Sequence, residues 1–232
     1  MSLVLIIILT TLVLAILIIA GLAVVNFSSD EMYEKFKKAS TVPTSISPIE
    51  LADIVSKKHF YNNIMVVLKP NKFCDCYSSN NILTLCSDYA NERQLAGLAI
   101  CAHELGHAFQ FANEKEKMKK YGAELKTSKI ISKFIAPLIL ASAVLVVFNK
   151  IIFGLSVFAL ACVLFVVALS VKMSTIKIEK QASDTAIKIL EHYANLTESE
   201  ISQAKMFLNS AKQTYVADML KYMLKWTGLT KK

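Results

Sequence analysis

Two long stretches of the 232-residue chain are almost free of charge, and they constrain its fold more than any other feature. Residues 1–25 carry no Asp, Glu, Lys or Arg, and residues 134–171 carry only Lys150. A helix of about 20 apolar residues is long enough to cross the hydrocarbon core of a bilayer. The rest of the chain has the charge density of an ordinary soluble domain. The sequence therefore predicts a membrane protein with a soluble part and excludes a disordered, collagenous or disulfide-rich secreted chain.

The apolar stretches predict three transmembrane helices. Residues 1–25 are expected to form a retained anchor, because a cleavable signal peptide begins with basic residues and none precede this stretch. The block at 130–171 is too long for one helix and is interrupted at residues 148–150, so it predicts a transmembrane hairpin. A buried helix of a soluble protein is the alternative, but a chain of this length cannot cover one so long.

A hairpin returns the chain to the side it left, so residues 26–129 and 172–232 are expected on one face of the membrane. These regions, with Lys133 counted in the first, hold 25 of the 26 basic residues, which favours the cytoplasmic face. We therefore expect a multi-pass protein of the cell membrane, with the lipid bilayer as a partner. Arg93 is the single arginine and no aromatic-basic pattern accompanies it, so nucleic acid is not expected as a partner.

The soluble part is predicted to be mostly helical with a small β-sheet. Ser47-Pro48-Ile49-Glu50 has the pattern of a helix start, with Ser47 as the N-cap, and predicts a helix to about Lys58. Residues 63–68 and 82–86 predict short strands, separated by a polar, turn-rich stretch at 70–81. Further helices are expected at about 91–113, 178–195, 198–217 and 218–226.

The predicted helix near residue 100 contains the pattern His103-Glu104-Leu105-Gly106-His107. Histidines four positions apart project from one face of a helix, so both can bind a single Zn²⁺. Glu104 lies next to that face, where it can take a proton from a water activated by the metal. Surface histidines that meet no metal are the alternative reading. Half of the chain's 4 histidines stand in this frame, which makes chance a poor explanation.

A catalytic zinc ion needs a third protein ligand and a position for water. The metzincin continuation is missing, because Gln110 and Asn113 stand where it requires Gly and His. An intramembrane protease is not expected, because its acidic zinc ligand would come from a later apolar helix and residues 134–171 contain no acid. We favour Glu179, which begins the predicted helix after the hairpin. Asp184 is the runner-up, either as a ligand or as a residue that orients a ligand histidine.

These motifs resemble those of the YugP-like neutral zinc metallopeptidases. The family core Ala-Ala-His-Glu-x-Gly-His-Ala-x-Gln is similar to CAHELGHAFQ at 101–110, and its Glu-Phe-Asp-Ala-Ser stretch to EKQAS at 179–183. The family's Thr-Tyr-Val-Ala recurs at 214–217. The likeness covers nearly the whole chain in order and spacing. The Glu-x-x-Ala segment also resembles that of the HtpX-like membrane peptidases.

The resemblance implies one catalytic zinc ion, peptide-bond hydrolysis, and Glu179 as third ligand, as in gluzincins. The expected fold is a mainly α membrane protein, with three transmembrane helices and a mostly helical, zincin-like cytoplasmic domain that contains a small β-sheet. Its expected parts are an anchor at 1–25, a cytoplasmic region with the histidine motif at 26–129, the hairpin at 130–171, and a helical region at 172–232.

The expected function is that of a membrane-anchored zinc metalloendopeptidase that acts on a polypeptide, such as a membrane or membrane-proximal protein. Glu104 is the expected general base, and Tyr215 is a candidate for stabilising the oxyanion, with a packing role as its alternative. A strand near Ile64 or Leu83 is expected to pair with an extended substrate. The alternatives are a catalytically silent zinc-binding scaffold or regulator of the membrane, and a zinc hydrolase that cleaves no peptide bond.

Overall fold

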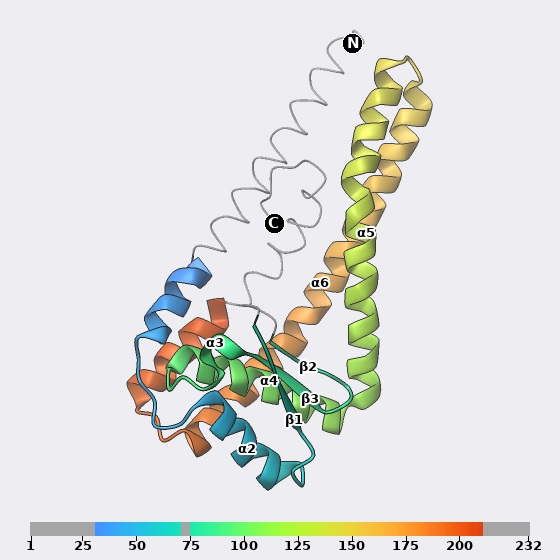
Figure 1. The fold of residues 1–232 in the computed structure, drawn as a ribbon. Helices are drawn as coiled ribbons and strands as arrows, with labels where there is room; N and C mark the ends of the chain where they lie inside the picture. The colour runs from blue at the N-terminus through green and yellow to red at the C-terminus, as the bar shows by residue number, and fades with distance from the viewer. Residues whose placement is uncertain (1–30, 71–74, 211–232) are drawn as a thin grey trace. The chain divides into compact units, whose positions relative to one another are not determined.

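The computed structural model describes residues 31–70 and 75–210, and this part of the chain divides into two compact units. The hairpin unit contains Gly122–Thr175, and the sheet unit contains Glu31–Tyr121 with the described residues 176–210. Helices α5 (Lys115–Val147) and α6 (Ile151–Tyr193) each contribute to both units (Figure 1). The anchor expected at 1–25 lies outside the described residues, and so does the helix expected at 218–226.

The small sheet of the sheet unit has the strand order β1-β3-β2. Strand β1 (Met65–Lys69) is parallel to β3 (Ile82–Cys86), and β2 (Cys76–Tyr77) is antiparallel to β3. The sequence predicted β1 and β3, but it assigned residues 70–81, which include β2, to turns. A strand of two residues is too short to show an alternating pattern, so β2 is defined only by its pairing with β3.

Helix α2 (Pro48–His59) begins as the sequence predicts. The backbone N–H of Ser47 donates to Oε2 of Glu50 at 2.6 Å, and the backbone N–H of Glu50 donates to Oγ of Ser47 at 3.3 Å. This reciprocal pair satisfies two N–H groups that no carbonyl within the helix can reach. The buried side chains Leu51, Ala52 and Val55 hold the helix on the core.

Helix α4 (Leu95–Asn113) passes through the core of the sheet unit. Its buried side chains include Leu95, Leu98, Ala99, Ala102 and Leu105, which have the spacing of one helix face. The sequence predicted that this helix begins at about residue 91, but α4 begins at Leu95. Residues 91–94 separate it from the short helix α3 (Ser87–Ala90). Gln94 cannot belong to α4, because it forms a β-bridge with Pro43 and has an extended backbone.

Helices α4 and α6 approach each other closely at Gly106. A Cβ atom at this position would lie 3.0 Å from the Cα atom of Ala182 and even closer to its carbonyl oxygen, at a separation that real Cβ atoms essentially never show. Only glycine therefore permits the observed approach of the two backbones. Ala182 lies three residues after Glu179. This contact therefore brings the part of α6 that contains Glu179 next to the histidine motif of α4.

In the hairpin unit, α5 and α6 lie side by side, and the turn between them falls at residues 148–150, where the sequence predicts it (Figure 1). The buried positions along the contact recur every seven residues, namely Ser128, Ile135 and Ser142 on α5 and Gly154, Ala161, Ala168 and Thr175 on α6. Small side chains allow two helices to pack closely. The hydroxyl of Ser128 also donates to the carbonyl oxygen of Ala168 at 3.3 Å.

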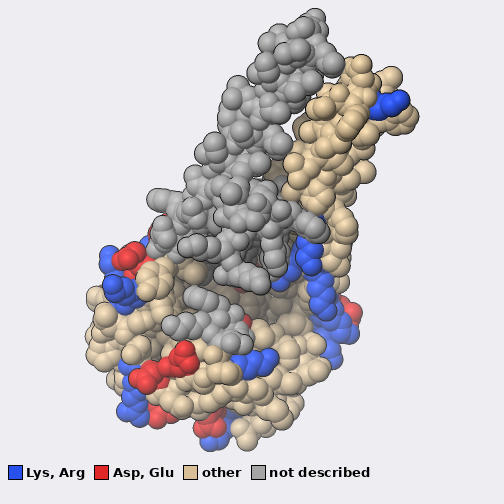
Figure 2. Space-filling model, turned by 45° about the horizontal axis from the view of Figure 1, so that its top comes forward, with Lys and Arg blue, Asp and Glu red and all other residues tan. Residues whose placement is uncertain are grey.

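Two helices of the described residues, α5 and α6, are long and apolar enough to cross a membrane. Their most apolar 18-residue windows have mean hydropathies of 2.4 and 2.9, and only 17% of each window is buried. Large apolar side chains such as Phe134, Phe153 and Val163 are exposed, and Figure 2 shows few charged residues on this part of the surface. Helix α6 is continuous to Tyr193, so it replaces two elements that the sequence predicted separately.

Candidate metal centre

Helix α4 places His103 and His107 on the same face, one turn apart. Their ring centroids are 4.8 Å apart, and the ring planes are nearly perpendicular at 87°. The opposite face of α4 is buried in the core, so the two imidazoles are directed away from it. The i, i+4 spacing of the motif thus gives the paired arrangement that the sequence predicts.

Glu179 reaches the same two imidazoles from helix α6. Its Oε2 atom lies 3.2 Å from Nε2 of His103 and 3.4 Å from Nε2 of His107. The carboxylate is nearly inaccessible to solvent, with 4% of the residue exposed. Within the described part of the chain, these three residues form the group whose ligand atoms, all within 4.8 Å of one another, can hold a metal ion.

The donor set and its spacing fit a zinc ion. Two imidazole nitrogens and one carboxylate oxygen are ligands that zinc prefers. Two ligands of a tetrahedral zinc, each about 2.0–2.1 Å from the metal, are separated by about 3.3 Å. The two distances from Oε2 of Glu179 to the histidine nitrogens, 3.2 and 3.4 Å, are close to this value. His103, His107 and Glu179 would therefore hold the zinc ion through Nε2, Nε2 and Oε2.

The second ring nitrogen of each histidine has its own partner. Nδ1 of His103 lies 3.2 Å from the hydroxyl of Ser183, and Nδ1 of His107 lies 2.8 Å from Oε1 of Gln110. The amide nitrogen of Gln110 donates to the backbone carbonyl of Ile178 at 2.8 Å. Because that carbonyl can only accept, Gln110 must present its oxygen to His107. Nδ1 of His107 consequently carries the hydrogen, and Nε2 is the nitrogen available to a metal.

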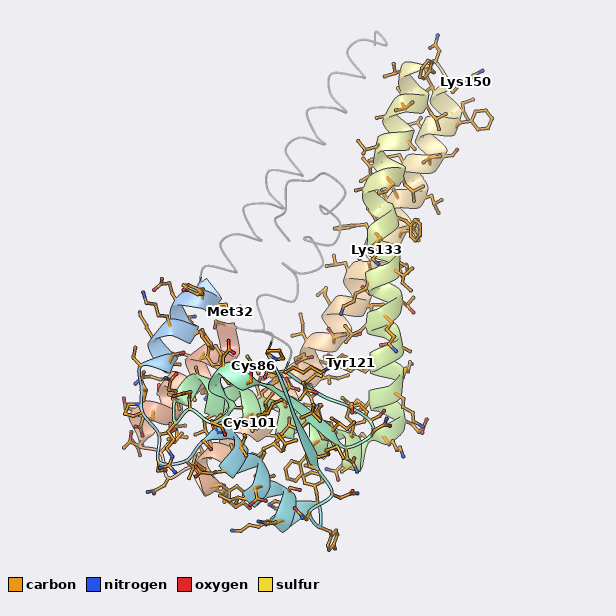
Figure 3. All side chains as sticks on the ribbon, viewed as in Figure 1. Met32, Cys86, Cys101, Tyr121, Lys133 and Lys150 are labelled. Atoms are coloured by element: carbon orange, nitrogen blue, oxygen red, sulfur yellow. The ribbon has the colours of Figure 1, made fainter. Side chains whose placement is uncertain are left out.

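Glu179 also has a partner on its other oxygen. The hydroxyl of Tyr121, from α5, donates to Oε1, and both residues are buried. Figure 3 labels Tyr121 on its helix. The two oxygens of the carboxylate thus have different surroundings, since Oε2 faces the histidines and Oε1 faces a phenol.

The charges of the cluster shift the pKa values of its members. Burial raises the pKa of Glu179, but hydrogen bonds from His103 and His107 and their charges outweigh burial and hold the pKa far below its ordinary value. Burial lowers the pKa of His107, yet the carboxylates of Glu179 and Glu104 raise it to about 9 overall. Without a metal ion, Glu179 is therefore ionised and His107 is protonated at neutral pH. A metal cation can take the place of the proton on His107.

Glu104 follows His103 on α4 and lies within electrostatic range of all three candidate ligands. Burial raises its pKa above the ordinary value, and the charges of the two histidines oppose this shift. A carboxylate with a raised pKa is a better proton acceptor near neutral pH than an ordinary one.

Other residues singled out by the sequence lie away from the cluster or outside the described residues. Asp184 is exposed on α6, and its neighbour Ser183 contacts His103 instead. His59, a histidine outside the motif, forms a hydrogen bond with the hydroxyl of Tyr193 at 2.7 Å. Tyr215, the expected stabiliser of the oxyanion, lies outside the described residues.

Sequence reasoning missed three residues that contact the candidate ligands: Gln110, Tyr121 and Ser183. Gln110 belongs to the quoted family core, and its position three residues after His107 was a usable signal for a contact on one helix face. Ser183 ends the quoted stretch at 179–183 and stands four residues after Glu179, so its place on that helix face was also a usable signal, whereas Tyr121 carries none. The partners of Tyr121 and Ser183 are 58 and 80 positions away in the chain, so the contacts themselves depend on packing.

Comparison with models of known protein families gives a match over residues 7–230, which is nearly the whole chain. The matching family is described as "Putative neutral zinc metallopeptidase". Comparisons with curated proteins and with solved structures found no match. The metal named by the family description agrees with the donor set of the candidate centre.

Proposed function

The chain belongs to this family of neutral zinc metallopeptidases, and from that premise we propose that it is a membrane-anchored zinc metalloendopeptidase of the gluzincin type. One observation carries the proposal. Residues 76 positions apart, His103 and Glu179, meet with His107 in a cluster of a buried carboxylate and two partly buried imidazoles, whose donor atoms have the spacing of zinc ligands. Charged and polar groups are rarely buried together unless they are paired or bind a metal.

We assign the chemical roles from the surroundings of each residue. When bound, zinc would polarise a scissile carbonyl and lower the pKa of a water molecule. Glu104 would accept the proton of that water and pass it to the leaving amine. Ser183 and Gln110 would keep the two histidines in the orientation that offers Nε2. For Tyr215 we keep the proposed role of stabilising the oxyanion.

We propose a polypeptide in extended conformation as the substrate. Sheet edges can bind such a chain through backbone hydrogen bonds. Of the two strands considered for this pairing, the one near Leu83 is β3, which is central and has a partner on each side. Among the described strands, β1, which follows Ile64, and β2 are the edges.

We further propose that the hairpin crosses the cell membrane and that the metal centre faces the cytoplasm. The exposed apolar surfaces of α5 and α6 support a lipid environment, because the core helix of a soluble protein would be mostly buried. The distribution of Lys and Arg along the chain supports the side. Under this proposal the bilayer is a partner, and a substrate at or near the membrane would meet the centre most readily.

Cleavage of an unfolded polypeptide by the detergent-purified full chain tests the function. Casein, incubated with the zinc-loaded protein, should give fragments that disappear with a chelator and return with added zinc. Glu104→Gln should retain one zinc per chain and lose activity by about 10²–10⁴-fold, because only the proton acceptor is removed. Zinc-loaded protein that cleaves none of several polypeptides would instead favour a silent zinc-binding scaffold, or a hydrolase active only on substrates other than peptides.

The ligand assignment needs a matched pair of variants on one helix. Glu179→Gln should lower the zinc bound per chain, measured by elemental analysis after dialysis. Asp184→Asn is the control, because it removes the same charge from an exposed position on α6 and should leave the zinc content unchanged. Full zinc content in the first variant together with loss in the second would show that the third ligand is misassigned.

A further inference from the structure

The hydrogen bond between Tyr121 and Glu179 joins two buried residues of the sheet unit. Tyr121 is 8% exposed and Glu179 is 4% exposed, and the phenol donates to Oε1 of the carboxylate. The two residues come from different helices and are 58 positions apart in sequence. The phenol is therefore aimed at the candidate ligand by the packing of α5 and α6 and not by local sequence.

The phenol contacts one oxygen of Glu179, while the histidines contact the other. Oε2 lies 3.2 and 3.4 Å from the Nε2 atoms of His103 and His107, and Oε1 accepts from Tyr121. A carboxylate that has both oxygens available can bind a metal ion through one or through both. A hydrogen bond on one oxygen favours binding through the other.

The phenol of Tyr121 is the donor in this hydrogen bond. An ordinary phenol has a pKa of about 10 and so carries its hydrogen near neutral pH, whereas an ionised carboxylate can only accept. The direction of the hydrogen bond is thereby defined.

We propose that Tyr121 is a positioning residue that restricts Glu179 to binding the metal through Oε2 alone. This inference rests on the proposed function, because it presupposes zinc at His103, His107 and Glu179. The coordination number of zinc explains why such a restriction would matter. A catalytic zinc site combines three protein ligands with a position for water, and a second oxygen from Glu179 would compete for that position.

Tyr121→Phe tests the inference, because it removes the hydroxyl and keeps the ring. We expect one zinc per chain to remain, with zinc affinity lowered by about 10–100-fold in a competition titration against a chromophoric chelator. The cobalt-substituted variant should absorb more weakly in the visible range than cobalt-substituted wild type, as a site does when it gains a ligand beyond four. In the cleavage assay, kcat should fall while KM stays near its wild-type value.

Tyr77→Phe is a matched control for the loss of a buried tyrosine hydroxyl. Tyr77 is 9% exposed and donates to Oδ1 of Asn81 at 2.9 Å, so its hydroxyl has no contact with the candidate ligands. This variant should keep the wild-type zinc affinity and cobalt spectrum. Equal changes in both variants would mean that Tyr121 acts through stability alone, and that result would overturn the inference.

The zinc-loaded wild-type protein gives a readout that does not depend on the folding of a variant. Its crystal structure should show one oxygen of Glu179 on the metal and the other within hydrogen-bond distance of the Tyr121 hydroxyl. Two oxygens on the metal would overturn the inference and leave the proposed function intact. A wild-type protein that takes up no zinc would overturn both.

Discussion

Under the proposed ligand assignment, a proton and a metal ion compete for Nε2 of His107. Nδ1 keeps its hydrogen because Gln110 accepts it, so the proton that leaves when a metal binds comes from Nε2. Burial lowers the pKa of His107, but Glu179 and Glu104 raise it to about 9 overall. The proton is therefore present at neutral pH in the metal-free protein, and the metal must displace it.

We expect the apparent zinc affinity to rise with pH up to about pH 9. A raised pKa means that the metal-free protein holds the proton below that pH, so each unit of falling pH costs about tenfold in affinity for the proton displaced from His107. Competition titrations against a chelator of known pH dependence measure this slope. An affinity that stays constant between about pH 7 and about pH 9 would contradict the assignment of His107 as a ligand.

At the scale of residues, the sequence predicted the parts of the cluster that lie within one helical turn. His103, Glu104 and His107 follow from spacing, because i, i+4 positions share a face in any helix. The choice of Glu179 over Asp184 needed an argument about how the chain folds back. The structure brings Glu179 to the histidines and leaves Asp184 exposed, although the two belong to one helix.

At the scale of elements, the crossing of α4 and α6 assembles the cluster. The backbones approach closely at Gly106 and Ala182, and Glu179 lies one turn before that contact on α6. Gly106 stands between the two histidines in sequence, so the histidine motif itself contains the residue that permits the crossing.

We expect Gly106→Ala to lower zinc content sharply and to destabilise the fold. The added Cβ would meet the backbone of Ala182, which cannot move aside without shifting α6 and the candidate ligand Glu179. Helix propensity alone predicts the opposite, since alanine favours a helix over glycine by about 1 kcal/mol. Zinc analysis and thermal unfolding measure the two effects.

Gly122→Ala provides the control for this prediction. A Cβ atom at Gly122 would meet no atom within 4 Å, so this variant gains helix propensity without a clash. Its zinc content should be that of the wild type, and its unfolding temperature should be equal or higher. Loss of zinc in both variants would mean that the crossing is not the cause.

The elements themselves were predictable where their signals are local. The capping pair of Ser47 and Glu50 and the turn at residues 148–150 are both where the sequence places them. Strand β2 and the unbroken length of α6 were not predictable. Strand β2 depends on its pairing with β3. The length of α6 arises because the polar residues after the apolar stretch continue the same helix.

At the scale of the whole molecule, the apolar hairpin separates the two halves of the cluster in sequence. Residues 134–171 lie between His107 and Glu179, and a chain that folds back on itself can return the acid to the histidines. If the proposed topology holds, the hairpin turn and the metal centre are expected on opposite faces of the membrane.

Thiol labelling of intact cells tests that topology. A membrane-impermeant maleimide added outside should label Lys150→Cys, at the hairpin turn, and should not label Asp184→Cys, which is exposed on α6. Labelling of Asp184→Cys should require permeabilised cells. Wild-type protein gives the background from the native cysteines, and the reverse pattern would place the metal centre outside the cytoplasm.

The sequence by itself determined the features that depend on one helical turn or one apolar stretch. These are the apolar hairpin, the paired histidines with Glu104, and the start of α2, because each follows from hydrophobicity or from backbone periodicity. Only the tertiary structure decided the contacts that surround the candidate ligands. Tyr121, Ser183 and the carbonyl of Ile178 reach their partners across 58, 80 and 68 positions, so packing of separate helices places them.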